Sequence, residues 1–290
     1  MTGPVASAAG HVALDKPEGR RWRWQMVVPA AVVAVYLLTG LVGESVAPYS
    51  ATDFNTGPPL APPSETHLFG TDGFGRDVFS RVLVGARTIL LLSLSATLLG
   101  VGAGCALGLV SGYRGGAVDE TVMRLVDVLL ALPGLLLAML ILTSLGPSSL
   151  NLVLAIGFVF IPKSARIARS AVLPLRNAGY VEAARLRGAG WASIVFAELL
   201  PIVLPQLVVE FCLRFAYALL LISSLGFLGF GVQPPTPDWG LMISEARNYV
   251  TIAPWPVLFP ALAIGLLVVA VNALADALTS SGERRVEQYL

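Results

Sequence analysis

Long runs of apolar residues follow one another along this chain, and most are close to the length that crosses a lipid bilayer. A hydrocarbon core of about 30 Å requires about 20 apolar residues in a helix. We therefore predict an all-α integral membrane protein with six transmembrane helices, the third kinked or broken near Pro133. The predicted spans are Met26–Val42, Thr88–Val110, Met123–Leu145, Leu150–Ile161 continuing towards Ala171, Val203–Leu225 and Trp255–Ala275.

The composition agrees with a membrane location. Hydrophobic residues make up 56% of the 290 residues and charged residues 13%, whereas soluble proteins carry about 25% charged residues. The net charge of +1 gives no overall field that would attract nucleic acid. The first apolar run is long enough to remain as an anchor instead of being removed as a signal peptide.

Basic residues indicate which loops face the cytoplasm. The stretch 163–201 contains six basic and two acidic residues, and such an excess is typical of the cytoplasmic side. Arginines beside tryptophans at 20–24 indicate the same side for the start of the chain. We predict cytoplasmic tails at 1–25 and 279–290, a membrane domain at 26–278, and an external segment at 44–87 that is rich in proline and acids.

The external segment contains a cluster of glycines and charges around 67–77. Its glycines permit tight turns, and two aspartates can cap helix starts. An arginine between them can pair with either acid. The residues that we single out in this external loop are Asp72, Gly75, Arg76 and Asp77.

The stretch from Arg176 to Pro201 is the longest amphipathic surface in the second half of the chain. Tyr180, Val181, Ala184 and Leu186 would form an apolar side, and Glu182, Arg185 and Arg187 a charged side. Glycines at 188 and 190 would end one helix and turn the chain into the next. The segment is either a surface that docks a soluble partner or a solvated loop between two spans.

Two charges lie inside the fifth predicted span. Glu210 and Arg214 are four residues apart, the spacing of a pair on one helix face. Charged residues in a membrane usually face a bundle interior or a water-filled path. The pair is therefore either structural and self-neutralising or part of a pathway.

The sequence contains no motif for using energy or for catalysis. Neither lysine, Lys16 or Lys163, follows a glycine, so a phosphate-binding P-loop is excluded. The two histidines, His11 and His67, are too far apart in sequence to form an HExxH zinc site, and the spans lack the clustered carboxylates or histidines of a proton relay. We expect that the chain is not an enzyme and that it binds no cofactor or metal.

Several motifs together resemble one transporter family. Glu182-Ala183-Ala184, then Gly188, then Leu200-Pro201 resembles the EAA loop of permeases in bacterial ATP-binding-cassette (ABC) importers. The segments 67–77 and 227–240, with Asn272 and Asp276, are similar to the C-type permease subunit of the dipeptide/oligopeptide/nickel family. The resemblance covers the chain from the first span to the sixth. It departs from the family pattern at Glu198, Ile202 and Ile222 and in the final tail.

The resemblance implies a type I ABC importer permease fold and a division of labour. A B-type permease would complete the pathway, two cytoplasmic ATPase subunits (or a fused pair) would bind ATP and Mg²⁺, and an extracytoplasmic binding protein would deliver the solute. The cytoplasmic coupling loop would span 172–201. Its ATPase-coupling residues would be Glu182, Ala183, Ala184, Arg185 and Gly188.

We therefore predict a permease subunit of an importer for short peptides, embedded in the lipid of the bacterial inner membrane. Nickel, glutathione or haem-like solutes are alternatives within the same family. A stand-alone secondary transporter or channel is the alternative from a different class, and it would transport without ATP.

Overall fold

The computed structural model describes residues 18–287, with side chains over 26–279. Throughout this part of the chain the regular elements are helical, which confirms the all-α prediction. In order they are α1 (Glu18–Val46), α2 (Val78–Arg114), α3 (Gly116–Leu130), α4 (Gly134–Leu145), α5 (Ser149–Val172), α6 (Gly179–Leu186), α7 (Trp191–Ser193), a π-helical turn (Ile194–Leu199), α8 (Leu200–Phe227), α9 (Trp239–Ala246), a 3-10 turn (Arg247–Tyr249) and α10 (Trp255–Glu287).

The membrane-spanning helices are longer than predicted. In the described part, five stretches are long and apolar enough to cross a membrane, and α3 with α4 makes a sixth if that bent pair is one span. Helix α2 begins at Val78 instead of Thr88 and has 37 residues, or roughly 55 Å at 1.5 Å per residue. It therefore projects beyond the bilayer and takes in the last part of the external segment predicted at 44–87.

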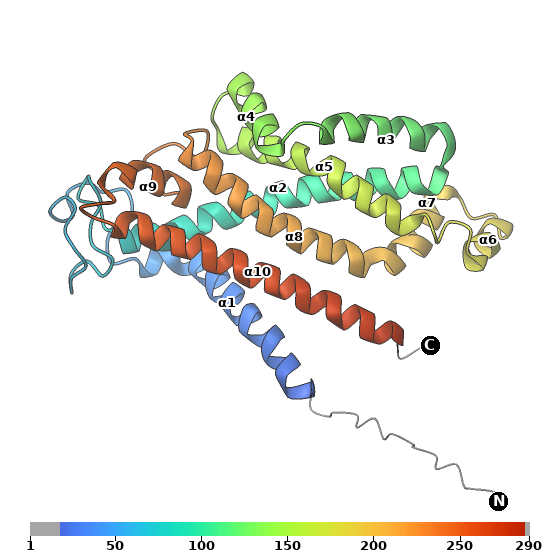
Figure 1. Cartoon of the computed structure of the whole chain (residues 1–290), viewed down its shortest axis with the longest axis horizontal. Coiled ribbons are helices and arrows are strands. Elements are labelled where there is room, and N and C mark those ends of the chain that lie inside the picture. Colours follow the sequence, from blue (N-terminus) through green and yellow to red (C-terminus); the bar gives the residue numbers. More distant parts are fainter. Residues whose placement is uncertain (1–17, 288–290) are drawn as a thin grey trace, which may run out of the picture.

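The third predicted span is broken, as the proline suggested. Helices α3 and α4 meet at an angle of 87°. Pro133 stands at the N-cap of α4, where its fixed φ is tolerated and its missing N–H costs no hydrogen bond. The chain thus makes a sharp elbow at 131–133, and α3 lies alongside α5 (Figure 1).

Glycines allow α2 and α5 to approach each other closely. A Cβ atom built on Gly100, Gly104 or Gly108 would come within 2.6 Å of a backbone oxygen of α5. Helix association in a membrane depends on such packing because lipid is as apolar as the helix surface. Gly102 lies on the same helix but outside this contact, since a Cβ there would meet nothing within 4 Å.

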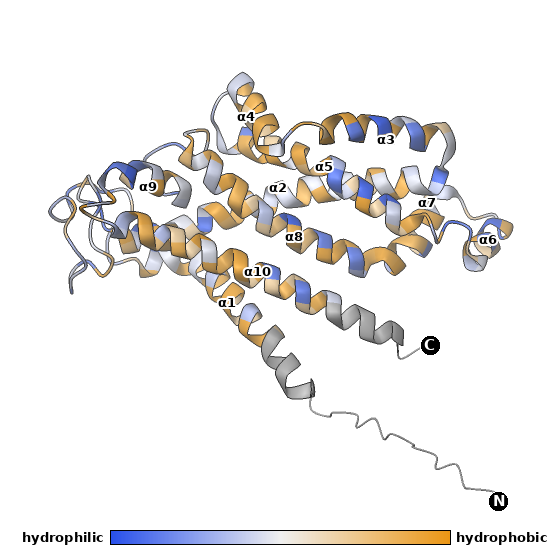
Figure 2. Ribbon diagram, in the orientation of Figure 1, coloured by the Kyte–Doolittle hydropathy of each residue, from blue (hydrophilic) through white to orange (hydrophobic). Residues whose placement is uncertain are grey.

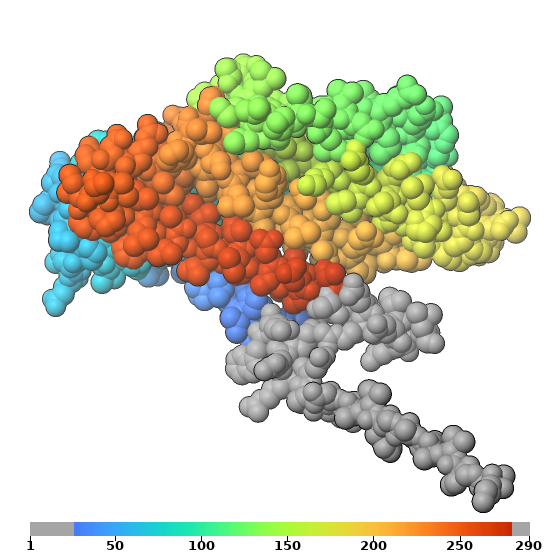
Figure 3. Space-filling model, in the orientation of Figure 1, coloured from blue at the N-terminus to red at the C-terminus, as the bar shows by residue number. Residues whose placement is uncertain are grey.

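The long helices run along one axis, and the polar segments gather at its two ends. Helix α6 lies at one end, while α9 and residues 47–77 lie at the other (Figure 1). The long helices are mainly apolar along their length, and hydrophilic residues are conspicuous on α3, α6 and α9 (Figure 2). On the face in Figure 3, α8 and α10 lie side by side.

The ends of the predicted membrane domain also differ from the structure. Helix α1 begins at Glu18, within the predicted tail 1–25, and α10 continues to Glu287, within the predicted tail 279–290. Residues 1–17 and 288–290 of those tails lie outside the described residues.

Candidate functional site

Helix α6 is the centre of the amphipathic segment at one end of the molecule. Val181 and Ala184 on its inner side are fully buried and pack in a cluster with residues of α2, α5 and the π-helical turn. The two side chains fix α6 to the ends of the long helices, so this segment is an ordered helix that the bundle holds in place.

Gly188 ends α6 because it adopts a backbone conformation that other residues avoid. Its φ is +79°, in the left-handed region where a Cβ costs roughly 1–2 kcal/mol. The N–H of Gly188 donates to the Arg185 carbonyl at 2.9 Å, and the N–H of Ala189 donates to the Ala184 carbonyl at 3.1 Å. This pair of hydrogen bonds is a Schellman cap, and it confirms the predicted glycine corner.

The outer side of α6 is partly apolar, which the sequence analysis did not predict. Leu186 is 86% exposed and Tyr180 is 36% exposed, although both were expected on the same apolar side as the buried Val181 and Ala184. The charged side was predicted correctly, since Glu182, Arg185 and Arg187 are all exposed. Trp191 and Phe196, further along the same segment, add exposed aromatic surface.

Polar contacts connect the coupling segment to the helices behind it. The Arg185 guanidinium lies over the Tyr113 ring at 5.1 Å and donates to its hydroxyl at 3.2 Å. Arg114 stacks over Trp191 at 4.5 Å. A movement of α6 would therefore be transmitted to the end of α2, where Tyr113 and Arg114 lie.

Glu210 and Arg214 of the fifth span form the predicted ion pair, and the two side chains lie in different surroundings. Arg214 Nε and Glu210 Oε1 are 2.9 Å apart, although Nε lacks the alignment of a hydrogen bond. Glu210 is only 2% exposed and accepts a hydrogen bond from Ser164 Oγ at 2.9 Å. Arg214 instead lines a cavity of about 570 Å³. The carboxylate is thus structural, while the guanidinium is open to a cavity.

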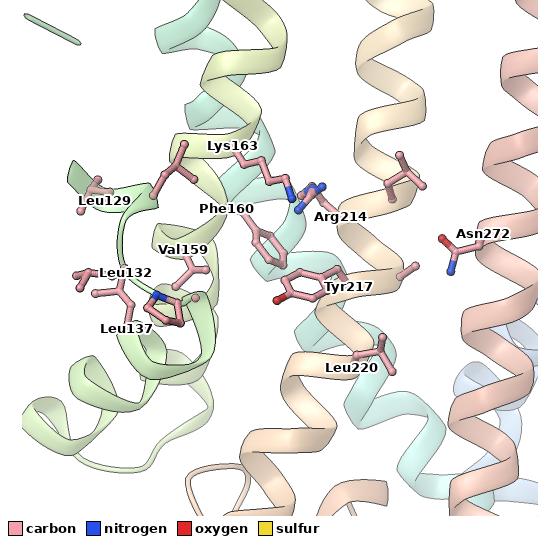
Figure 4. A pocket seen from close by; sticks show the side chains of 15 residues that line it. Leu129, Leu132, Leu137, Val159, Phe160, Lys163, Arg214, Tyr217, Leu220 and Asn272 are labelled. Atoms are coloured by element: carbon pink, nitrogen blue, oxygen red, sulfur yellow. The ribbon is translucent and has the colours of Figure 1, made fainter. Parts of the chain in front are cut away.

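That cavity lies between the α3–α4 elbow and helices α5, α8 and α10 (Figure 4). Of the residues that line it, Arg214 was identifiable from the sequence as one member of the ion pair, and Asn272 only through the family resemblance. The lining role of Lys163 and Tyr217 was not predicted. Lys163 had counted among the basic residues that indicate the cytoplasmic side, but it lies within α5. A lysine directly after a proline inside an apolar span was the signal that could have found it.

The external loop is held by a charge network at the opposite end. Asp72 Oδ2 accepts from Arg76 Nε at 2.6 Å, and Arg76 Nη2 donates to Glu245 of α9 at 2.5 Å. Arg81 Nη2 donates to the same Glu245 oxygen at 3.3 Å. The arginine does pair with an acid as predicted, but Glu245, its second partner, was missed because it lies far away in sequence.

The two aspartates of this loop have different roles. Asp77 caps α2 by accepting from the Ser80 N–H at 2.8 Å, and it pairs with His67 Nδ1 at 2.9 Å. Asp72 was also expected to cap a helix, but it accepts from the N–H groups of Phe74 and Arg76 and so closes a turn. Gly75 has a φ of +70° within that turn, consistent with the predicted tight turn.

The predicted site residues thus fall into three separate places. Helix α6, with the predicted coupling residues, lies at one end of the molecule and the segment 67–77 at the other (Figure 1). The Glu210–Arg214 pair lies on α8, and its arginine lines the cavity. The external residues contact α9, and Trp255 at the start of α10 donates to the Thr71 carbonyl at 3.0 Å. Within the described residues, the three places are therefore separate sites.

Comparison with known proteins identifies the family. Residues 104–288 match the model described as "Binding-protein-dependent transport system inner membrane component". The chain is 40% identical over 267 residues to the glutathione transport system permease protein of Pectobacterium atrosepticum, covering 89% of this chain and 87% of the relative. It is 37% identical over 262 residues to the dipeptide transport system permease protein of Haemophilus influenzae, covering 88% and 89%.

A third relative agrees with these two. The chain is 43% identical over 239 residues to the di/tripeptide transport system permease protein of Pseudomonas aeruginosa, covering 80% of this chain and 79% of the relative. All three are named as permease proteins, in agreement with the expectation that this chain is not an enzyme. The chain therefore belongs to the family of inner membrane components of binding-protein-dependent transport systems.

Proposed function

We propose that this chain forms half of the translocation pathway of an ABC importer for short peptides, with glutathione as the alternative solute. The proposal is supported by relatives that are named for dipeptide, di/tripeptide and glutathione transport. A stand-alone transporter or channel is disfavoured, since the family depends on a separate binding protein. Nickel and haem-like solutes find no support among the names of these relatives.

The proposal assigns a partner to each end of the molecule. The end with α6 faces the cytoplasm and docks one of two ATPase subunits (or half of a fused pair), which bind ATP and Mg²⁺. The end with α9 and the external loop faces the binding protein. A B-type permease completes the pathway. The observation that carries the docking role is an ordered helix, fixed from behind by Val181 and Ala184, that exposes Leu186.

Both ends of the described chain fit this orientation. Helix α1 begins, and α10 ends, towards the end of the molecule that bears α6 (Figure 1). We infer that both termini are cytoplasmic. Closure of the ATPases would then push α6 and, through the π-helical turn and α8, rock the helices that border the cavity.

Leu186→Asp tests the docking role. Burying a leucine side chain contributes about 1.5–3 kcal/mol, so a charge in its place should weaken ATPase binding at least 10-fold. The fold should survive because Leu186 is 86% exposed. The measurements are co-purification of the ATPase subunits and ATP hydrolysis stimulated by loaded binding protein in the reconstituted complex.

The matched control is Ile252→Asp. Ile252 is 75% exposed and lies at the opposite end of the molecule, so its replacement should leave ATPase co-purification unchanged. If Leu186→Asp retained full binding and stimulation, the docking surface proposed for α6 would be wrong. If both variants lost the ATPase subunits equally, the loss would reflect general damage to the complex.

A further inference from the structure

The cavity between the α3–α4 elbow and helices α5, α8 and α10 has two cationic side chains in its lining. Lys163 of α5 and Arg214 of α8 both line it, and their nitrogen atoms point towards each other in Figure 4. The two positive charges repel each other, and burying a charged side chain within a membrane costs free energy. Two cations that converge in one cavity therefore indicate an anionic partner.

In the described part of the chain, the acids near the cavity do not balance these two cations. Glu210 pairs with Arg214, but it is 2% exposed and also bound by Ser164, so it lies behind the cavity wall. Lys163 is exposed and makes no ion pair with any acid in the described part of the chain. The cavity thus keeps one uncompensated positive charge.

Aromatic rings hold the Arg214 side chain in place, and a polar side chain lies in the same lining. The Arg214 guanidinium lies 6.0 Å from the Phe160 ring and 5.8 Å from the Tyr217 ring, within the range of cation–π attraction. Asn272 lines the same cavity from α10 and points towards α8 in Figure 4. Most of the remaining lining is leucine and other apolar side chains, as is common in sites for small solutes.

We propose that this cavity is a transit site that receives the carboxylate of the carried solute through Lys163 and Arg214. Apolar lining around the elbow at 131–133 would contact the uncharged part of the solute. The inference rests on the proposed function, because it assumes that the cavity belongs to the pathway. It adds that the pathway itself selects for a free carboxylate, in addition to any selection by the binding protein.

Transport by the complete complex in proteoliposomes tests the selectivity. The same short peptide is supplied with a free carboxyl terminus and as its amide, with one preparation of binding protein throughout. A hydrogen bond to a charged group contributes about 1.5–3 kcal/mol, so Lys163→Gln should lower the acid-to-amide rate ratio on the order of 10-fold. Lys163→Arg should keep most of it.

Arg166→Gln is the matched control. Arg166 lies one turn further along α5, but it pairs with Asp127 and does not line the cavity. Its replacement should leave the acid-to-amide ratio unchanged. If Lys163→Gln slowed both peptides equally, Lys163 would serve assembly, for example by pairing with an acid of the companion permease, and the proposal would be overturned.

A chemical probe tests the cavity independently of transport. In the complex with Cys105 and Cys212 replaced by alanine, Leu220→Cys places a thiol on the cavity wall. An anionic methanethiosulfonate should react faster than a cationic one, relative to their rates with a free thiol. Adding Lys163→Gln should reduce that preference on the order of 10-fold, whereas Arg166→Gln should not.

The transport assay and the thiol-labelling assay together distinguish a wrong solute class from a wrong assignment of the carboxylate site. If the wild-type complex moved neither peptide but the anionic reagent still showed the preference that depends on Lys163, the proposed solute class would be wrong and the anion site would stand. If the two reagents reacted alike, relative to their rates with a free thiol, the carboxylate site would be refuted.

Discussion

Asp238 is a buried carboxylate at the start of α9. Its Oδ1 accepts from the Leu241 N–H at 2.9 Å and so caps the helix. Burial raises the pKa of Asp238 to about 6, and the backbone N–H groups of Leu241 and Gly240 oppose the rise. The two residues that follow Asp238 are also constrained by packing. Trp239 is fully buried. A Cβ atom on Gly240 would lie 2.1 Å from the Ser223 carbonyl oxygen, so only glycine fits there. The Asp-Trp-Gly motif is therefore structural.

The pKa of Asp238 predicts a pH dependence of stability. Because the pKa in the folded state is above the usual value of 3.8, the folded state holds a proton that the unfolded state has released. The contribution of Asp238 to the free energy of unfolding is then greatest below pH 4. It falls as the pH rises to about 6, by up to about 3 kcal/mol. Asp238→Asn removes the titration and keeps the capping oxygen.

The thermal midpoint of the purified complex, measured from pH 4 to pH 8, checks this prediction. The midpoint of Asp238→Asn relative to wild type should rise between pH 4 and pH 6 and then stay level. A difference that is constant with pH would show that Asp238 has an ordinary pKa.

The most extensive helix contact in the described part of the chain is between α2 and α5, and it supports the cavity. Gly104 lets Ser164 of α5 approach, since a Cβ on Gly104 would lie 2.8 Å from the Ser164 Cβ. Ser164 in turn donates to Glu210 of α8, and Glu210 pairs with Arg214 at the cavity wall. The position of one charged wall residue thus depends on a glycine two helices away.

Gly104→Ala should destabilise the packing of α2 against α5. The added methyl group would meet the Ile161 carbonyl at 2.6 Å, and overpacking of this kind costs about 1–3 kcal/mol. Thermal unfolding of the complex in detergent measures the loss. Gly102→Ala is the control, because it lies on the same helix and faces open space. Equal effects of the two substitutions would mean that α2 and α5 do not pack as described.

At the scale of the whole molecule, the polar segments lie at the two ends (Figure 1), and the cavity is lined by the long helices α5, α8 and α10 with the α3–α4 elbow. The external loop and α9 are joined by Arg76, Arg81 and Glu245, whereas α6 is joined to α2 and the π-helical turn. Side-chain contacts therefore hold each end together, and each end offers a surface on which a partner could dock. The long helices provide the mechanical connection between them.

Accessibility of introduced cysteines tests the orientation that we propose. In a background with Cys105 and Cys212 replaced, Leu186→Cys should react with a membrane-impermeant reagent only when the cytoplasmic face is open. Ile252→Cys should react from the outside in intact cells, because it lies at the other end of the molecule. Labelling of Leu186→Cys in intact cells would reverse the orientation and remove the basis for ATPase docking.

The sequence by itself determined the helical class, the membrane location, the broken third span and the family. Those properties depend on local composition, on spans of a set length and on residues close together in the chain, such as Gly188 at the end of α6. Pairs at short spacing were also predictable, as Glu210 with Arg214 and Asp72 with Arg76 show, because helix and turn geometry fixes their distance.

The tertiary structure alone decided which side of each element is covered. Leu186 and Tyr180 are apolar, yet they face outward because Val181 and Ala184 already fill the inner contact of α6. Likewise, only packing brings Lys163 beside Arg214, 51 positions further along the chain, or places Glu245 against Arg76. The periodicity of the sequence shows which residues share a face of a helix. Which of those faces packs against another helix depends on the positions of all the other helices, and only the complete fold fixes those positions.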